Sequence, residues 1–206
     1  MDIYRHDDSF RKKGFPVIAG IDEAGRGPIA GPVVAAAVIL PPRVRIDGLR
    51  DSKKVPEKER LHLFREVLVS ASGIGVGIVD HVEIDRTNIL AATRTAMKAA
   101  CEDLSYAPDA LIIDAVSLPG VAIEQFPIIK ADAKSASVAA ASIIAKHVRD
   151  LLMLRFDGLY PEYGFRRHKG YCTREHMDMI AVHGPCPIHR RTFRQVLTAE
   201  LPFPLP

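Results

Sequence analysis

The chain has 206 residues, which is enough for one domain with a sizeable core or for one domain with a small appendage. Its hydrophobic content of 48% and charged content of 26% are ordinary for a soluble globular protein, and the formal net charge of +3 is too small to indicate a partner by itself. The first fourteen residues have no apolar core, and the longest aliphatic run, Val33 to Leu40, is far shorter than the roughly 20 residues that cross a bilayer, so we expect neither a signal peptide nor a membrane anchor.

The first predicted strand, Val17 to Ile21, ends in two adjacent carboxylates, Asp22 and Glu23. Because side chains alternate across a strand, these carboxylates cannot both point to solvent unless the strand ends there, so one of them lies near the edge of the core. A buried anion is costly unless a positive group neutralises it, and a divalent cation held by oxygen ligands is the commonest remedy. The pair therefore predicts a metal site, with an exposed turn as the plain alternative.

The glycine-rich loop from Gly20 to Gly27 nearly matches the phosphate loop of nucleotide hydrolases. Arg26 stands where that motif has lysine, and Gly27 stands where it has serine or threonine. Two carboxylates inside a bare phosphate cradle would repel phosphate unless metal ions lay between them. The loop therefore favours metal-bridged phosphodiester chemistry over nucleotide hydrolysis.

The remaining segments predict an α/β fold with a mixed sheet flanked by helices. Further strands are expected at 33–40, 73–79, 111–114 and 127–130, and helices at 57–70, 85–104 and 135–156. The last two strands lead to Asp114 and Asp132, and open α/β sheets place ligands outside the carboxyl ends of strands. We expect these two carboxylates to converge with Asp22 and Glu23 and to hold two divalent ions about 3.5 to 4 Å apart. Asp150, a competing fourth ligand, is expected to be solvated or to pair behind the ligands.

The region 155–194 is locally basic, with eight lysines and arginines against four acidic residues. In a nearly neutral protein this indicates a polyanion partner, with a solvated face as the alternative. The three cysteines show no C-x-x-C spacing, which favours a reducing cytoplasm and argues against zinc or thiol chemistry.

Four motifs resemble bacterial ribonuclease HII in order and spacing. They are Gly20-Ile-Asp-Glu-Ala-Gly-Arg-Gly-Pro28, Asp51-Ser-Lys-Lys54, Lys130-Ala-Asp132 with Ala140-Ala-Ser-Ile-Ile-Ala-Lys146, and Tyr163-Gly-Phe-x-x-His-Lys-Gly-Tyr-x-Thr173. The resemblance runs from Val17 to Phe193. It implies a ribonuclease H-like catalytic core over residues 1–156 and a small, basic helical C-terminal extension over residues 157–206, which helps to bind the duplex and ends in a disordered tail.

This resemblance implies an endoribonuclease that hydrolyses the RNA strand of RNA/DNA hybrids and cuts 5′ of ribonucleotides embedded in duplex DNA, leaving 3′-hydroxyl and 5′-phosphate ends. Asp22, Glu23, Asp114 and Asp132 correspond to the family's metal-binding acids, and an all-oxygen ligand set favours Mn²⁺ or Mg²⁺. No histidine base is required, so His168, His183 and His189 are interpreted as structural. The implied substrate-binding residues are Gly25, Arg26 and Gly27 at the ribose 2′-hydroxyl and Tyr171 at the neighbouring sugar. Lys53, Lys169 and the side chain of Arg26 are candidates to hold phosphates.

Three alternatives stay open at this point. A junction-resolving or transposase-like DNA nuclease of the same superfamily also needs clustered carboxylates, but it has no use for a 2′-hydroxyl sensor. A ribonuclease H with an added N-terminal substrate-binding domain would need more than the roughly sixteen residues that precede the first strand. A basic binding module without catalysis would not explain the buried acids. We expect a monomer, with a weak sliding-clamp contact through the tail 195–206 as an alternative to disorder.

Overall fold

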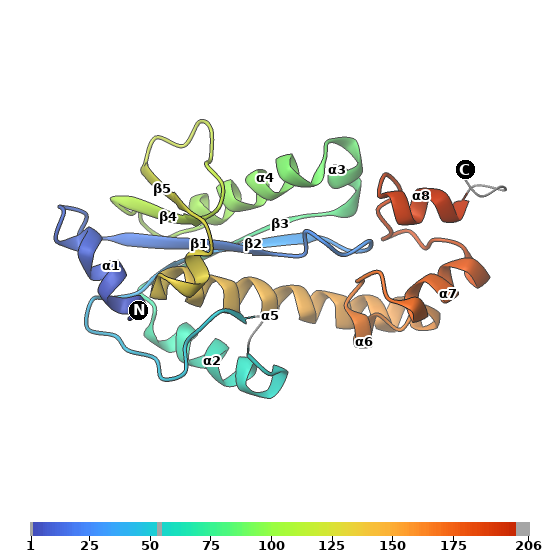
Figure 1. The fold of residues 1–206 in the computed structure, drawn as a ribbon, viewed down its shortest axis with the longest axis horizontal. Helices are drawn as coiled ribbons and strands as arrows, with labels where there is room; N and C mark the ends of the chain where they lie inside the picture. Colours follow the sequence, from blue (N-terminus) through green and yellow to red (C-terminus); the bar gives the residue numbers. More distant parts are fainter. Residues whose placement is uncertain (1, 53–54, 201–206) are drawn as a thin grey trace.

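The computed structural model describes residues 2–52 and 55–200 and confirms the mixed sheet (Figure 1). Five strands lie in the order β3-β2-β1-β4-β5. β1 is antiparallel to β2 and parallel to β4, and the outer strands β3 and β5 pair antiparallel with β2 and parallel with β4. The strand bounds are β1 Ile18–Ala24, β2 Val33–Ile39, β3 Gly73–Val79, β4 Ala110–Asp114 and β5 Glu124–Ile128.

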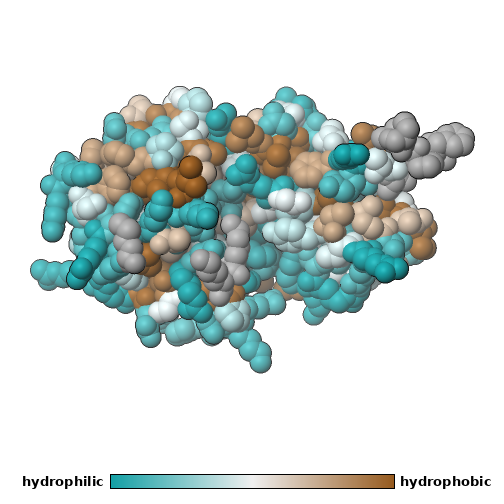
Figure 2. Space-filling model, in the orientation of Figure 1, coloured by the Kyte–Doolittle hydropathy of each residue, from teal (hydrophilic) through white to brown (hydrophobic). Residues whose placement is uncertain are grey.

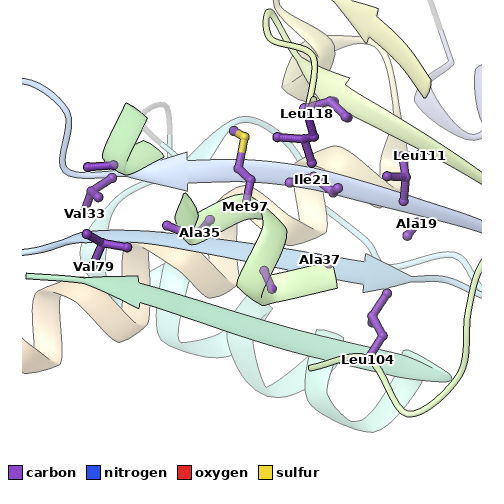
Figure 3. Packing of buried hydrophobic residues seen from close by; sticks show 14 of the residues in the cluster. Ala19, Ile21, Val33, Ala35, Ala37, Val79, Met97, Leu104, Leu111 and Leu118 are labelled. Carbon is purple, nitrogen blue, oxygen red and sulfur yellow. The ribbon is translucent and has the colours of Figure 1, made fainter. Parts of the chain in front are cut away.

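Helices cover both faces of the sheet (Figure 1). α3 (His81–Arg86) and α4 (Ile89–Glu102) lie on one face, and α2 (Glu57–Ser70) and α5 (Ala136–Leu159) lie on the other. α4 packs on alternate residues of the central strands, and Figure 3 shows this core cluster with Met97 next to Ile21. The C-terminal part adds α6 (Phe165–His168), α7 (Arg174–His183) and α8 (Arg194–Glu200) beyond one end of the sheet.

Three sequence predictions differ from the structure. The helix expected at 85–104 is two helices, because the chain breaks at Thr87 and Asn88 starts α4 by accepting a hydrogen bond from the N–H of Ala91. The strand expected at 127–130 lies earlier, at β5, where Pro127 is tolerated because the strand is at the edge of the sheet. Helix α1 (Ile3–Arg11) was not expected, and its buried Asp7 accepts hydrogen bonds from α5.

The C-terminal tail begins later than expected. Residues 194–200 form α8, and Val196 is fully buried, so disorder from residue 195 is wrong for this part. Residues 201–206 lie outside the described residues. α5 continues to Leu159, past the boundary expected at residue 156, and the division into a core and an extension stays a prediction.

No helix in the described residues has both the length and the apolar composition that crossing a membrane requires. Figure 2 shows a face on which hydrophilic residues are interrupted by several hydrophobic areas, one of them over β5.

Close packing of α5 on β1 gives the first testable prediction. A Cβ atom on Gly20 would lie 2.1 Å from the backbone carbon of Ser137 and 2.2 Å from the nitrogen of Val138. Gly20→Ala therefore forces helix and strand apart and is expected to cost about 3 kcal/mol of unfolding free energy, which lowers Tm by roughly 6 to 12 °C.

Gly158→Ala is the matched control, because Gly158 lies in α5 with no atom within 4 Å of an added Cβ. It should stabilise the helix by about 0.5 to 1 kcal/mol. Thermal unfolding of both variants checks the pair, and equal Tm values would contradict the close contact between α5 and β1.

Candidate active site

Two predicted metal ligands occupy matching positions at the carboxyl ends of neighbouring strands. β1 and β4 are parallel, and their register pairs Ile21 with Ile113. Both isoleucines belong to the core cluster on the α4 side, so the next residue of each strand, Asp22 and Asp114, faces α5. Neighbouring strands are about 4.8 Å apart, which places the two carboxylates side by side on one face. Asp22 is only 2% exposed.

The third acid, Glu23, has a buried carboxylate oxygen that lacks a donor. Its Oε1 accepts a hydrogen bond from Arg26 at 3.2 Å, whereas Oε2 has no hydrogen-bond partner among the described residues. The backbone N–H of Glu23 donates to Asp22 Oδ1 at 2.7 Å. An orphaned carboxylate oxygen is costly, and a cation is the usual remedy. The all-oxygen donor set of these acids fits a hard divalent cation such as Mg²⁺ or Mn²⁺.

Asp132 lies close to Asp114 through the backbone. It sits in a short 3-10 helix, η2 (Ala131–Ala133), and Asp114 Oδ1 accepts a hydrogen bond from the N–H of Ala131 at 2.8 Å. Asp132 is 7% exposed. In the ranges that the structure describes, no three acidic, histidine or cysteine side chains meet closely enough to form a metal site. The four-carboxylate cluster therefore stays a prediction, supported by the placement of the backbone.

A pocket of about 120 Å³ opens beside Glu23. It brings together the predicted glycine loop and Tyr171, and it is lined by Glu23, Ala24, Gly25, Arg26, Gly27, Ser52, Lys146 and Tyr171. A Cβ atom on Gly27 would meet only the ring of Tyr171, at 3.7 Å, so loop and ring face one another across open space. Tyr171 is 44% exposed. The pocket therefore brings the residues predicted to contact the sugar next to Glu23.

Of the two predicted phosphate-binding lysines, Lys169 does not line this pocket. Lys169 is 9% exposed, and its ammonium group donates to the carbonyl of Arg166 at 2.7 Å. Lys53 lies outside the described residues. Sequence reasoning missed Lys146 as a pocket residue. Its position inside an alanine-rich helix was the available signal, because a lysine on a buried face rarely serves packing alone.

Asp150 is held in a buried charge network. Its carboxylate accepts hydrogen bonds from Arg60 Nη1 at 3.1 Å and from the ammonium group of Lys146. Burial lowers the pKa of Lys146. A solvated Asp150 is therefore wrong. The expectation that Asp150 and its neighbour Arg149 pair with different groups is confirmed, since Arg149 donates to backbone carbonyls.

Of the three histidines interpreted as structural, His168 and His189 contact backbone carbonyls. His168 Nε2 contacts the carbonyl of Tyr163 at 2.8 Å, and His189 Nδ1 contacts that of Cys186 at 3.2 Å. Desolvation by burial lowers the pKa of His189 to about 4, so this ring is neutral at pH 7. His189 Nε2 also contacts His176 Nε2 at 2.9 Å, so the ring links α7 to the segment that follows it.

Comparison with known proteins decides the family. The family model described as ribonuclease HII matches residues 19–196, which span β1 to α8 and include every element of the site. The chain belongs to the ribonuclease HII family. It is therefore an endoribonuclease that acts on RNA/DNA hybrids, and the alternatives of a DNA-only nuclease and a non-catalytic binding module are set aside.

Relatives of this ribonuclease HII come from several organisms. The chain is 57% identical over 182 residues to ribonuclease HII of Acetivibrio thermocellus, covering 88% of this chain and 71% of that protein. The crystal structure of ribonuclease H2 from Pyrococcus horikoshii OT3 superposes with a TM-score of 0.74 at 28% identity, covering 89% of this chain and 97% of the other. The PCNA:RNase HII complex from Archaeoglobus fulgidus gives 0.71 at 25% identity, covering 86% and 95%.

Proposed function

We propose that this ribonuclease HII cuts on the 5′ side of a ribonucleotide, including a single one embedded in duplex DNA. The observation that carries the proposal is the adjacency of Asp22 and Asp114 on one face of the sheet, beside a pocket that joins the glycine loop to Tyr171. The carboxylates supply a site for hydrolysis, and the pocket supplies a surface for one ribose. Products with 3′-hydroxyl and 5′-phosphate ends follow from hydrolysis of the bond to the 3′-oxygen.

Asp22, Glu23, Asp114 and Asp132 would hold two Mg²⁺ or Mn²⁺ ions, and ions bound there would supply Lewis-acid activation of water and charge stabilisation at the leaving oxygen. Asp22 is fixed by the N–H of Glu23, and Asp114 by that of Ala131, so each carboxylate keeps one oxygen oriented by backbone. Four carboxylates repel one another, and a cation would draw them together. The chain's own part is to orient these oxygens and to exclude water from the buried Asp22.

The residues that line the pocket would contact the sugar. Glycine at position 27 leaves room for a ribose to approach the backbone, where peptide groups can hydrogen-bond the 2′-hydroxyl that separates RNA from DNA. The ring of Tyr171 would stack on the neighbouring deoxyribose. Arg26, whose side chain is 43% exposed beside Glu23, would contact a phosphate of the bound strand.

Metal removal is the experiment that tests this proposal. Treated with a chelator, the enzyme should lose cleavage of an RNA/DNA hybrid, and Mn²⁺ or Mg²⁺ should restore it. Titration calorimetry should show Mn²⁺ binding that Asp114→Asn weakens by at least about tenfold. Full activity in excess chelator would contradict the proposal.

Affinity for the duplex should depend steeply on salt, because phosphate contacts release counterions. Arg26→Ala, Lys53→Ala and Lys169→Ala should each reduce the slope of log affinity against log salt concentration by about one unit. Lys98→Ala is the control, since Lys98 lies on α4, across the sheet from Asp22, and should leave the slope unchanged. Fluorescence anisotropy at several salt concentrations gives the slopes. Identical slopes in all four variants would contradict the proposed phosphate contacts of Arg26, Lys53 and Lys169.

We also propose that the basic C-terminal part helps to bind the duplex. A sliding-clamp contact through the tail is a further proposal, supported by the PCNA:RNase HII complex from Archaeoglobus fulgidus. Val196 is buried in the fold and is not available for such a contact, whereas Leu197 is 47% exposed.

A further inference from the structure

Two arginines are buried against the carbonyl groups of the loop between β1 and β2. Arg190 is 0% exposed and Arg149 is 1% exposed. Arg190 donates to five carbonyls of this loop, those of Gly25 at 2.6 Å, Pro28 at 2.7 Å, Gly31 at 2.9 Å, Arg26 at 3.1 Å and Pro32 at 3.2 Å. Arg149 donates to the carbonyls of Pro32 at 3.0 Å, Ala30 at 3.1 Å and Lys169 at 2.9 Å. The loop is thus folded around two guanidinium groups.

All three nitrogens of each guanidinium donate to backbone carbonyls. Burial lowers the pKa of Arg190 to about 9 and that of Arg149 to about 10, so both stay charged at neutral pH. Buried cations are expensive, and here the carbonyl dipoles of the loop, together with that of Lys169, offset the cost. The direction of each of those carbonyls is fixed in return.

The fixed carbonyls determine where the loop's N–H groups point. In a planar trans peptide the C=O and the N–H point in opposite directions. Because the carbonyls of Gly25 and Arg26 turn inward to Arg190, the N–H groups of Arg26 and Gly27 turn outward. No hydrogen bond found in the described parts of the chain uses either N–H. Both residues line the pocket that also contains Tyr171.

Gly25 is required by this arrangement. Its φ of +103° is unfavourable for other residues, and a Cβ atom there would lie 2.2 Å from Arg149 Nε. The glycine at 25 therefore accommodates the arginine beneath the loop, whereas the glycine at 27 leaves room on the pocket side.

We propose that Arg190, supported by Arg149, is a positioning residue that sets specificity for a ribose 2′-hydroxyl by aiming the N–H groups of Arg26 and Gly27 into the pocket. The inference rests on the proposed function, in which this loop reads the ribose. It assigns to the C-terminal part of the chain a role in substrate selection beyond duplex binding.

The test is a ratio of dissociation constants, measured by fluorescence anisotropy in EDTA so that binding is read without metal-dependent cleavage. The probes are an all-DNA duplex and the same duplex with one ribonucleotide. The wild-type enzyme should bind the duplex with the ribonucleotide about tenfold more tightly than the all-DNA duplex, which is the contribution of one net hydrogen bond. Arg190→Met should lower this ratio to less than about twofold. The dissociation constant of the all-DNA duplex should stay within about twofold of its wild-type value. Arg190→Lys, with three donors on one nitrogen, should give an intermediate ratio.

Asp85→Ala is the matched control. Asp85 holds the chain just after Arg190, accepting hydrogen bonds from the N–H groups of Arg191 at 2.8 Å and Thr192 at 3.1 Å, but it does not contact the loop carbonyls. The Asp85→Ala variant should show the same ratio of dissociation constants as the wild type. Should Arg190→Met fail to fold by circular dichroism, Arg190→Lys decides.

A wild-type ratio near one would overturn the proposed reading of the ribose, and this inference with it. A tenfold wild-type ratio that both Arg190 variants retain would overturn the inference alone. An equal loss in Asp85→Ala would also overturn it, because the effect would then come from the packing of the segment.

Discussion

Asp22→Asn is expected to reduce cleavage at least about 10³-fold, which corresponds to about 4 kcal/mol in the activation barrier. The substitution removes one charge from a carboxylate that is 2% exposed at the centre of the predicted metal site. It preserves shape, and the asparagine Oδ1 can still accept the hydrogen bond from the N–H of Glu23. Folding and duplex affinity should therefore change little. Single-turnover cleavage and anisotropy, measured on one preparation, separate the two effects.

Asp150→Asn is the matched control for this prediction. It also neutralises a buried carboxylate, but one that is paired with Arg60 and Lys146. Its loss should appear mainly as a lower Tm, because two partly buried cations lose their partner, with cleavage reduced less than tenfold. Asp132→Asn should be about as damaging as Asp22→Asn. Retention of more than a tenth of the wild-type rate by Asp22→Asn, or greater damage from Asp150→Asn, would show that the metal ligands are wrongly chosen.

Tyr171→Ala should slow cleavage of a single embedded ribonucleotide roughly tenfold to a hundredfold, because stacking on nucleic acid contributes about 1 to 3 kcal/mol. The backbone at this position is held without the ring: its N–H donates to the carbonyl of His168, and its carbonyl contacts Nδ1 of His176. The ring can therefore be removed without unfolding the pocket. Cleavage within continuous RNA paired to DNA should fall less, since that substrate never offers the neighbouring deoxyribose.

The observable is the ratio of the two cleavage rates. Tyr171→Phe, which keeps the ring, should stay near the wild-type ratio. Tyr106→Ala removes a similarly exposed tyrosine that bonds Ser72, away from the pocket, and should leave both rates unchanged. Equal losses of rate on the two substrates in Tyr171→Ala would make Tyr171 a general binding residue. That result would contradict the proposed stacking of its ring on the neighbouring deoxyribose.

Much of the sheet and part of the site could be predicted from local patterns. Apolar runs bounded by glycine and proline identify β1 to β4, because apolar runs this short and bounded by turn residues are typical of buried strands. Asp22, Glu23 and Asp114 stand out because carboxylates directly follow those runs. Their place at one edge of the sheet then follows from the parallel pairing of β1 with β4.

What the sequence could not predict depends on distant partners. α1 is mostly polar, and it is fixed by Asp7, which bonds Ser137 on α5, 130 residues away. Arg149 and Arg190 look like surface arginines, yet both are buried, because their acceptors are backbone carbonyls of a loop far along the chain. Backbone carbonyl acceptors leave no pattern in the sequence. The burial of the two arginines and the direction of the loop's N–H groups therefore could not be predicted without the structure.

The most direct measurement compares two duplexes that differ by one 2′-oxygen, with Mg²⁺ or Mn²⁺ present and the products mapped to the nucleotide. The account predicts a single cut on the 5′ side of the ribonucleotide, with 3′-hydroxyl and 5′-phosphate ends, and no cut in the all-DNA duplex. Equal cleavage of the two duplexes, or cuts placed without regard to the ribonucleotide, would contradict it.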